Sequence, residues 1–548
     1  MEEFDSIIIG SGAGGLATAL CLSRAGQKVL VLEQHSVPGG WSHSFTLNGQ
    51  RFSPGVHYIG LLDEGQSTSD LYKGLGVAND IVFFRMNKKA YDHCIINGQK
   101  FDFPAGIENL EKNLIHYFPT EEKNIKEYLN LVKKVSEELQ LIPKLKGFWQ
   151  NITVPFRTKH FGKFALFSLK RVVNWHTKNE MLKAVLNAQC GDHGLPPSRA
   201  SFPVHCSVMN HYFEGGFYPM GGGAGIVKAI TSKIKNYGGI IKTQQTVTKI
   251  VVENKKAVGV ELSSGERILA KNIISNADPT TTYLKLIGKE NISKKLSKKL
   301  ETTKYSVTSL ILFLTLDMDV TKYGIDSGNI WHFKDENIDA HFETLMKADI
   351  TQGEEFPAFF MSCTTLKDPV SFNGRFHNFE VVTYVDYESF NEFEGTNYHC
   401  PKYEVFKNKI IEKFLNSVEK LIPNARQHII QAELGTPKTN QFYINSTRGN
   451  VYGTEKTLRQ VGPFAFKNKT EIENLFLCGA STLSHGVTGA TYSGLATAAK
   501  ILNCHPDDLL IEDGTQKITI FDAEDASTWS DYIYKKREDK KRTFKEVD

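Results

Sequence analysis

The stretch Phe4-Asp5-Ser6-Ile7-Ile8-Ile9-Gly10-Ser11-Gly12-Ala13-Gly14-Gly15 decides the fold. An apolar strand over residues 4–9 leads into glycines, and a helix over 16–25 and a second strand over 28–33 follow. In a GxGxxG turn the first glycine permits the tight turn, the second lets the backbone approach a pyrophosphate, and the third lets helix and strand pack closely. The order of elements predicts the βαβ start of a parallel, dinucleotide-binding sheet.

An acidic residue, Glu33, follows the glycine turn at the spacing typical of a dinucleotide site. Glu33 ends the second strand, roughly 20 residues after the turn, where its carboxylate can accept both ribose hydroxyls and disfavours a 2′-phosphate. NAD and FAD share these features. The following Gly39-Gly40 resembles the glutamate-to-double-glycine extension of two-dinucleotide-domain flavoproteins, which simple NAD dehydrogenases lack. This resemblance favours FAD, and the glycines at 221–225 do not follow a strand, so no separate NAD(P)H site is evident.

Composition limits the alternatives. The chain has 548 residues, 41% of them hydrophobic, which allows a large core and two or more domains. Its 65 basic and 61 acidic residues are too balanced to predict a nucleic-acid partner. The eight cysteines occur singly, so we expect neither a metal site nor a disulfide framework. Without a recognisable signal peptide or an apolar run of ~18 residues, we expect a cytoplasmic protein.

Two later segments of the chain are expected to complete the nucleotide-binding sheet. Residues 221–279 read as a helix with Ile226, Ile230 and Ile234 at helical spacing, then strands at 240, 247–253, 257–262 and 268–275. Residues 474–479 read as a closing strand, followed by a helix over 494–502. The predicted fold class is therefore α/β, a Rossmann-type FAD-binding domain like that of glutathione reductase, with a discontinuous α+β substrate domain. The predicted FAD-binding segments are 1–71, 211–290 and 437–510, the substrate segments are 72–210 and 291–436, and 511–548 is a charged C-terminal tail.

Three blocks of sequence span nearly the whole chain. The first is Phe-Ser-Pro-Gly-Val-His-Tyr-Ile-Gly at 52–60, the second runs from Asn210-His211-Tyr212 through Tyr218-Pro219-Met220-Gly221-Gly222 to Ser275-Asn276-Ala277-Asp278-Pro279, and the third from Thr439 to Gly494. Together they resemble the phytoene desaturase, carotenoid isomerase and retinol saturase group of flavoproteins. The first two blocks are most similar to retinol saturases. The chain departs from the group at Trp41-Ser42, where retinol saturases carry cysteines, and at Ser484-His485, near which the carotenoid enzymes have a proline.

The resemblance implies an oxidoreductase that moves a hydride between FAD and a carbon–carbon double bond of a hydrophobic polyene, as a saturase, desaturase or isomerase. The electron donor or acceptor stays open. An amine-oxidase-like flavoenzyme and a non-enzymatic prenyl-lipid carrier of the same fold are the alternatives. The residues expected to bind FAD are Gly10, Ser11, Gly12, Ala13, Gly14, Gly15, Glu33, Gln34, Gly39, Gly40, Trp41, Ser42, Val247, Asn276, Gly479, Val487, Thr488 and Gly489.

No serine triad, metal-spaced histidine cluster or catalytic carboxylate pair stands out. His57 is the best polar candidate, because the resemblance places its block beside the isoalloxazine, where an imidazole could donate to the ring or shuttle a proton. It could equally be a structural histidine. Tyr58 and His211 are further catalytic candidates, and His205, Tyr212 and His485 are weaker ones that could simply line a cavity.

A basic, aromatic segment separates Glu138 from Glu180, with no acid between them. Its cations are Lys144, Lys146, Arg157, Lys159, Lys163, Lys170, Arg171 and Lys178, and they alternate with Phe148, Trp149, Phe156, Phe161, Phe164, Phe167 and Trp175. Aromatic anchors beside cations are typical of a helix in the headgroup region of an anionic membrane, although such a helix can also pack on its own domain. We therefore expect peripheral membrane contact. The mixed charge run at 535–542 predicts a solvated, partly disordered tail.

Overall fold

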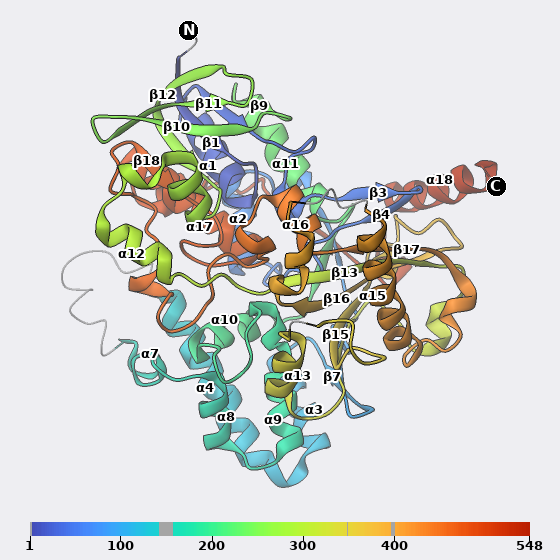
Figure 1. Ribbon diagram of the computed structural model, residues 1–548. Coiled ribbons are helices and arrows are strands. Elements are labelled where there is room, and N and C mark those ends of the chain that lie inside the picture. The colour runs from blue at the N-terminus through green and yellow to red at the C-terminus, as the bar shows by residue number, and fades with distance from the viewer. Residues whose placement is uncertain (1–2, 142–156, 348, 396–399, 548) are drawn as a thin grey trace.

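The computed structural model describes residues 3–141, 157–347, 349–395 and 400–547 (Figure 1). Its first sheet has the order β10-β11-β12-β1-β2-β9, and β18 also pairs with β12. These strands are β1 (Glu3–Ile9), β2 (Val29–Leu32), β9 (Ile240–Lys242), β10 (Val247–Glu253), β11 (Lys256–Leu262), β12 (Arg267–Ser275) and β18 (Leu475–Leu477). β1 lies parallel to both β2 and β12, and β12 lies parallel to β18. Three distant segments therefore build one Rossmann-type sheet, and the strands expected in all three are confirmed.

Helices cover the face of this sheet on which Ile8 lies. They are α1 (Ala13–Arg24), α11 (Gly223–Asn236) and α17 (Gly486–Leu502). Successive strand residues point to opposite faces, so Ile8 packs in a core with these helices, whereas Ile7 and Ile9 pack in a second core on the other face. Helix α17 begins eight residues before the predicted start at 494, because the glycine-rich stretch from Gly486 forms its first turn.

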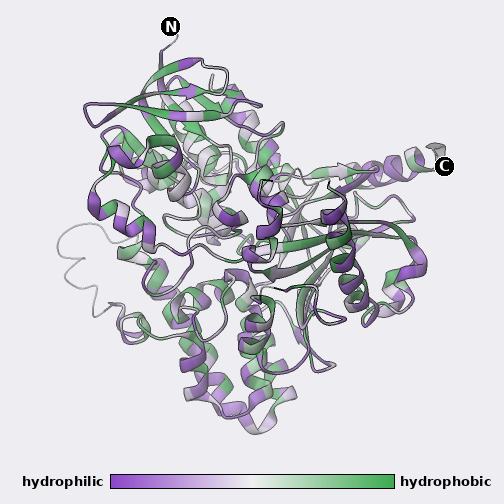
Figure 2. Cartoon of the chain, in the orientation of Figure 1, coloured by the Kyte–Doolittle hydropathy of each residue, from purple (hydrophilic) through white to green (hydrophobic). Residues whose placement is uncertain are grey.

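A second sheet, of order β17-β13-β16-β15-β14-β6-β7, forms the other large layer. Its strands are β6 (Asp92–Ile96), β7 (Gln99–Phe103), β13 (Thr308–Leu316), β14 (Asn329–Phe333), β15 (Ala358–Cys363), β16 (His377–Val385) and β17 (Ile429–Gly435). All nine residues of β13 are buried, and in Figure 2 the strands of this sheet are largely hydrophobic. Two chain segments about 200 residues apart share it, as expected for a discontinuous α+β domain.

Helices gather at one end of the second sheet (Figure 1). Helices α2 (Ser67–Leu75) and α12 (Lys294–Thr302) pack in the two cores of the first sheet. The helices outside the Rossmann-type layer include α3 (Ile107–Tyr117), α4 (Glu122–Leu141), α7 (Lys159–Phe164), α8 (Leu169–His176), α9 (Glu180–Asn187), α10 (Phe202–Tyr212), α13 (Ile338–Leu345), α15 (Pro401–Glu419) and α16 (Pro437–Ile444). Helices α4 and α10 share one core with β13 and β16. No helix in the described ranges is both long enough and apolar enough to cross a membrane.

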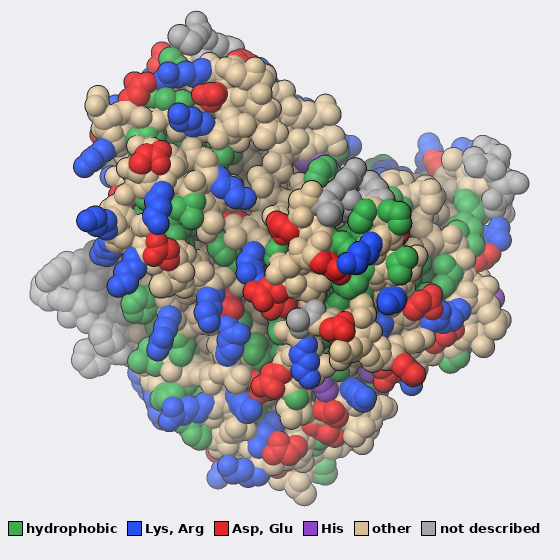
Figure 3. Space-filling model, in the orientation of Figure 1, with side chains coloured by type: hydrophobic (Ala, Val, Ile, Leu, Met, Phe, Trp, Pro, Cys, Tyr) green, Lys and Arg blue, Asp and Glu red, His purple; other side chains and the backbone are tan. Residues whose placement is uncertain are grey.

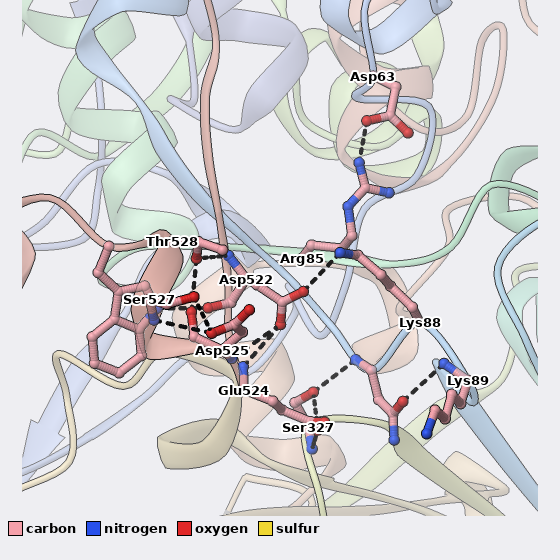
Figure 4. Close-up of polar contacts among 12 residues, drawn as sticks. Asp63, Arg85, Lys88, Lys89, Ser327, Asp522, Glu524, Asp525, Ser527 and Thr528 are labelled. Carbon is pink, nitrogen blue, oxygen red and sulfur yellow. Dashed lines mark hydrogen bonds and ion pairs between the residues drawn. The ribbon is translucent and has the colours of Figure 1, made fainter.

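The C-terminal region differs from the expected disordered tail. Strand β19 (Thr519–Asp522) pairs in parallel with β5 (Val82–Arg85), which also pairs with β8 (Phe217–Pro219), and helix α18 (Asp531–Val547) follows. The expectation that the glycines at 221–225 do not follow a strand was wrong, because β8 precedes them; β8 belongs to this small sheet and not to the Rossmann-type sheet. Side-chain contacts tie this region to the rest of the molecule, including Lys88 Nζ to Asp522 Oδ2 at 2.9 Å and Ser327 Oγ to Glu524 Oε1 at 2.7 Å (Figure 4). The helix forms because lysine, arginine and glutamate favour helices, while the buried Ile533 anchors its start.

Candidate functional site

A cavity of about 1070 Å³ lies between the two large sheets. One end is lined by the glycine turn after β1, by the end of β2 and by the first turn of α17. The other end is lined by aromatic side chains from several elements, among them Tyr58, Tyr212, Trp331, Phe360, Tyr384 and Tyr452. The glycine turn lies where β1 ends, which is where open α/β sheets bind their ligands.

The glycine turn is packed too tightly for side chains. A Cβ on Gly15 would lie 2.2 Å from the carbonyl oxygen of Gly10, and one on Gly12 would lie 2.6 Å from Asn276 Nδ2. Gly10 has a φ of +88°, a conformation that L side chains rarely adopt. Asn276, from the end of β12, accepts a hydrogen bond of 3.0 Å from the Gly15 N–H. The turn therefore brings α1 close to β1 and β12.

Glu33 is fixed across this turn. One carboxylate oxygen accepts hydrogen bonds from the Ser11 N–H at 2.8 Å and the Ser11 hydroxyl at 2.5 Å, and the other accepts one from the His35 N–H at 2.8 Å. The Gly39 N–H donates to the Ser11 hydroxyl at 3.0 Å, so the double glycine belongs to the same network. Oε2 thus accepts two hydrogen bonds already, whereas Oε1 accepts one and retains acceptor capacity for a sugar hydroxyl.

Two helix N-termini face the cavity. Neither the N-cap of α1, Gly12, nor that of α17, His485, supplies a side-chain cap. The first N–H groups of a helix have no partners within the helix and carry a partial positive charge. A Cβ on Gly486 would meet nothing within 4 Å, so the start of α17 borders open space. This arrangement suits an anionic, elongated ligand such as a dinucleotide.

The cavity brings together nearly all residues predicted to bind the cofactor. Those that line it are Gly10, Ser11, Gly12, Ala13, Gly14, Glu33, Gln34, Gly39, Gly40, Trp41, Ser42, Val247, Asn276, Gly479, Val487, Thr488 and Gly489. Gly15 does not line it; its position serves the packing of helix against strand. The chemistry of these groups, backbone N–H donors at two helix ends and an acid that can accept a ribose hydroxyl, fits a flavin dinucleotide.

The family of the chain follows from comparison with known proteins. The family described as flavin containing amine oxidoreductase matches residues 13–502. The chain belongs to this family. Within the flavin-containing amine oxidoreductases, it is 30% identical over 527 residues to all-trans-retinol 13,14-reductase of Danio rerio, covering 92% of this chain and 86% of the relative. A second Danio rerio relative, 26% identical over 93% of this chain and 88% of its own length, is named inactive all-trans-retinol 13,14-reductase.

A further relative and a solved structure extend the likeness. Prolycopene isomerase 1 of an Oncidium hybrid cultivar is 26% identical, covering 91% of this chain and 84% of its own. The solved structure of putrescine oxidase bound to putrescine superposes with a TM-score of 0.63 at 14% identity, covering 92% of this chain and 99% of that one. At that identity the likeness shows the fold alone. The predicted fold class and the resemblance to the retinol saturase and carotenoid isomerase group are confirmed.

His57 lies on the cavity wall and is held from two directions. Its Nδ1 lies 3.0 Å from Oε2 of Glu380, a fully buried acid on β16. Its backbone carbonyl accepts a hydrogen bond of 2.8 Å from Lys367 Nζ. Lys367 is buried as well; burial lowers its pKa to about 7, against the opposing charges of Glu380 and Asp92. His57 is thus an anchored cavity residue, and its catalytic role stays a prediction.

Tyr58, Tyr212 and His485 also line the cavity. The Tyr58 and Tyr212 rings stack with centroids 4.0 Å apart. His485 donates through Nε2 to the backbone carbonyl of Asp192 at 2.9 Å.

The other two histidines bond chiefly to backbone. His211 lines the cavity, but its Nε2 accepts a hydrogen bond of 2.9 Å from the Gly60 N–H, and burial lowers its pKa to about 4. This hydrogen bond occupies Nε2 and holds the ring against the backbone, and the catalytic role of His211 stays a prediction. His205 lies outside the cavity lining and contacts His193 at 3.3 Å and the Leu186 carbonyl at 3.2 Å.

A polar cluster that the sequence did not predict consists of four buried residues and the half-buried Asp192. It contains Asp92, Asp192, Gln189, Asn329 and Lys367. These residues are far apart in sequence and form no known motif, so only the fold brings them together. An acid within the mostly uncharged stretch Asn187-Ala188-Gln189-Cys190-Gly191-Asp192 was the one local signal available.

Proposed function

We propose that this protein binds FAD and acts on carbon–carbon double bonds of a polyene lipid of the retinoid or carotenoid class, as a saturase, desaturase or cis-trans isomerase. The observation that supports this proposal is one continuous cavity with a dinucleotide-type cradle at one end and an aromatic chamber at the other. When bound, the flavin would supply hydride transfer, which is the reaction class its named relatives imply.

The cradle residues have distinct parts in this proposal. The N–H groups at the start of α1 bind the pyrophosphate, and Glu33 binds the adenosine ribose. Val247 lies on the cavity wall at the start of β10, where its backbone can hold the adenine. The first turn of α17, with Val487, Thr488 and Gly489, borders the flavin end.

The aromatic chamber suits a long apolar substrate. Tyr58 and Tyr212 stack on each other, and Trp331 packs edge-to-face on Phe360 at 4.8 Å. From there the cavity wall continues along α10, through Val204 and Val208, to Leu139 and Gln140 near the end of α4. Such a chamber excludes water from the substrate and holds a planar polyene by stacking.

An amine substrate fits the chamber less well. A protonated amine needs an anionic partner or an aromatic cage free to receive it. Asp192 is the acid that lines the aromatic end among the described residues, and burial and the nearby Asp92 raise its pKa well above the usual range. A carboxyl group with a raised pKa is a weak anionic partner for an ammonium ion, and the Tyr58 and Tyr212 rings already stack on each other, so we favour the polyene over the amine.

The carrier alternative requires a defective nucleotide site. The glycine turn, Glu33 and the start of α17 are all intact and border one cavity. Purified protein that stays colourless and takes up no FAD would nevertheless support a carrier. An absorption spectrum after reconstitution decides this point before any substrate is tested.

We also propose that the enzyme contacts an anionic membrane with its basic, aromatic segment. In the described part of that segment, Leu166 and Trp175 are 76% and 52% exposed. The Arg171 guanidinium lies 4.8 Å from the Phe167 ring and 5.1 Å from the Trp175 ring. Figure 3 shows basic and apolar side chains together at this edge, near α7 and α8. Lys144, Lys146, Phe148, Trp149 and Phe156 lie outside the described residues.

The experiment that tests the function is incubation of flavin-loaded protein with retinoids, carotenoids and unsaturated fatty acids, each under reducing and oxidising conditions, with products weighed by mass spectrometry. A gain of two hydrogens indicates a saturase, a loss a desaturase, and unchanged mass with altered retention an isomerase. The same panel includes primary amines. Turnover of amines with no conversion of any polyene would refute the proposal.

A further inference from the structure

Asp192 occupies the boundary between the two ends of the cavity. It belongs to a short 3-10 helix, Ala188–His193, and its backbone carbonyl accepts a hydrogen bond from His485, the N-cap residue of α17. This contact fixes Asp192 beside the first turn of α17, which borders the proposed flavin end. Its side chain is half-buried and lines the cavity together with Tyr58 and Tyr212. Asp192 thus lies where a substrate in the chamber would approach the cofactor.

The two oxygens of the Asp192 carboxyl group have different surroundings. Oδ2 lies 2.8 Å from the Tyr58 hydroxyl. Oδ1 has no hydrogen-bond partner among the described residues of the chain, so it is available to the cavity. A proton on Oδ1 would leave Oδ2 free to accept from Tyr58. The geometry therefore presents a donor to the cavity while the other oxygen is held.

Hydrogen-bond counting supports a neutral Asp192. The Tyr58 hydroxyl lies near two carboxyl groups, Asp192 at 2.8 Å and Asp92 Oδ2 at 3.3 Å, but it has a single proton to donate. Asp92 has its own donors, since Gln189 and Asn329 each donate to one of its oxygens at 2.8 Å. Asp92 is therefore equipped to be the anion of the pair, and Asp192 is not.

The electrostatic surroundings point the same way. Burial raises the pKa of Asp192 well above its usual range, and the neighbouring Asp92 raises it further. Burial also raises the pKa of Asp92, to about 6, against the hydrogen bonds from Gln189 and Asn329 and the charge of Lys367. Two interacting carboxyl groups separate their titrations, so one holds a proton at neutral pH while the other has lost it.

We propose that Asp192 is the acid that exchanges a proton with the substrate carbon next to the one that exchanges the hydride. This proposal rests on the proposed function. In the saturating direction, Asp192 Oδ1 would give a proton to one carbon of the double bond, and the hydride with its two electrons would reach the neighbouring carbon from the reduced flavin. The carbon–carbon π bond breaks, two carbon–hydrogen bonds form and the flavin is oxidised. The resulting carboxylate accepts a hydrogen bond from Tyr58 and regains its proton from water after product release.

Infrared difference spectroscopy tests the protonation state without any substrate. In full-length, flavin-loaded protein near neutral pH, we expect the carbonyl band of a protonated carboxylic acid that shifts in D2O. Asp192→Asn should remove this band, and Tyr58→Phe should move its frequency because one hydrogen bond is lost. Glu64→Gln changes a carboxyl group of 89% side-chain exposure and is the matched control that should leave the band in place. A wild-type spectrum without a band that Asp192→Asn removes would overturn the proposal.

Single-turnover kinetics test the role in the reaction. With a polyene that the wild type converts, Asp192→Asn should slow product formation by at least about 100-fold, the lower range for loss of a general acid or base. Its flavin content and its reduction by dithionite should match the wild type. Asp192→Glu should restore part of the rate with a changed pH profile. An Asp192→Asn rate within about threefold of the wild type would refute Asp192 as the acid and leave the proposed function standing.

The two proposals fail in distinguishable ways. A wild-type protein that converts no polyene refutes the function, whereas the infrared band still reports the state of Asp192. Should Asp192→Asn lose its flavin, Asp192→Glu and Tyr58→Phe replace it in both measurements. The proposal would then be overturned if Asp192→Glu converted the polyene at the wild-type rate and Tyr58→Phe left the infrared band at its wild-type frequency.

Discussion

At the scale of single residues, the nucleotide turn depends on the absence of side chains rather than on their chemistry. Gly15 does not line the cavity, yet a Cβ there would overlap the backbone oxygen of Gly10. Backbone cannot move aside as a flexible side chain can. The third glycine of the motif therefore acts on the site indirectly, by setting the distance between α1 and β1.

Gly15→Ala should lower the free energy of unfolding by about 1–3 kcal/mol, the usual cost of an overpacked methyl group, and reduce the FAD content. Urea unfolding and the flavin absorbance of purified protein measure the two effects. Gly162→Ala is the control, because a Cβ at this helical glycine meets nothing within 4 Å. Alanine favours helices, so the control should equal or exceed wild-type stability. Equal stability and flavin content in both variants would contradict this account.

At the scale of elements, the edge of the second sheet is closed by a charged histidine. His93 on β6 lies 2.6 Å from Asp102 on β7 through Nδ1 and 3.0 Å from Asp326, before β14, through Nε2. Both ring nitrogens face carboxylates, so both must donate and the imidazole is protonated. Burial lowers the pKa of His93, but Asp102 and Asp326 outweigh this and raise it to about 9, against the weaker repulsion of Lys100.

A pH dependence of stability follows from this pKa. The folded value, about 9, exceeds the unfolded value of about 6.5, so the folded protein binds the extra proton. The stabilisation is complete below pH ~6.5 and is lost as the pH rises through about 9. Urea unfolding across this range should show the decline in the wild type and lose most of it in His93→Gln. His116→Gln, at an exposed histidine, should retain the wild-type slope.

Strand β19 and helix α18 are held against the rest of the molecule by a small core around Trp529. Trp529 is buried beside Phe84, Ala523 and Ile533, and its indole N–H donates to the Asp522 carbonyl at 2.6 Å. Trp529→Ala should lower the free energy of unfolding by about 3 kcal/mol through the cavity it leaves. Tyr532→Ala, three residues later and 54% exposed, should change it by less than about 0.5 kcal/mol. Similar urea midpoints for the two variants would show that the segment is detached in solution.

At the scale of the whole molecule, one part of the cavity wall lies close in the chain to the basic, aromatic segment. Leu139 and Gln140 line the cavity near the end of α4, and the acid-free stretch begins after Glu138. An enzyme for a water-insoluble substrate would benefit from this placement, because the substrate could pass from the bilayer to the cavity. The membrane proposal therefore implies that the protein is oriented with its basic, aromatic segment toward the bilayer.

Sedimentation with vesicles tests that orientation. The wild type should bind vesicles rich in phosphatidylserine, less so at high salt, and little to neutral vesicles, since each basic residue near the surface contributes about 1 kcal/mol. Replacing both Leu166 and Trp175 by alanine should weaken binding by about tenfold or more through lost apolar insertion. The matched control is the double replacement of Phe442 and Tyr443, which are 61% and 42% exposed on α16. Equal binding by both double variants would contradict the proposed surface.

The sequence by itself determined the nucleotide-binding half of this protein, because that half is encoded locally. A strand, a glycine turn, a helix and Glu33 follow one another within 33 residues, and each residue type has one physical reason to be there. The returning strands at 268–275 and 474–479 were predictable for the same reason, since strand periodicity and the resemblance agree. The helical C-terminus was not, because its charge pattern suits both a disordered run and an exposed helix, and burial of Trp529 and Ile533 decided between them.

Only the tertiary structure decided the polar interior of the half built on the second sheet. Asp92, Asp192, Lys367 and Glu380 lie on segments up to 288 residues apart and share no motif spacing. Their protonation states depend on burial and on one another, which are properties of packed side chains and not of local sequence. The contacts of His205 and His211 depend on packing in the same way, since their ring nitrogens bond to groups distant in sequence, and the catalytic role of His211 stays a prediction. The glycine turn and Glu33 could therefore be predicted from the sequence, whereas Asp192 could be proposed as the proton donor only once the fold was known.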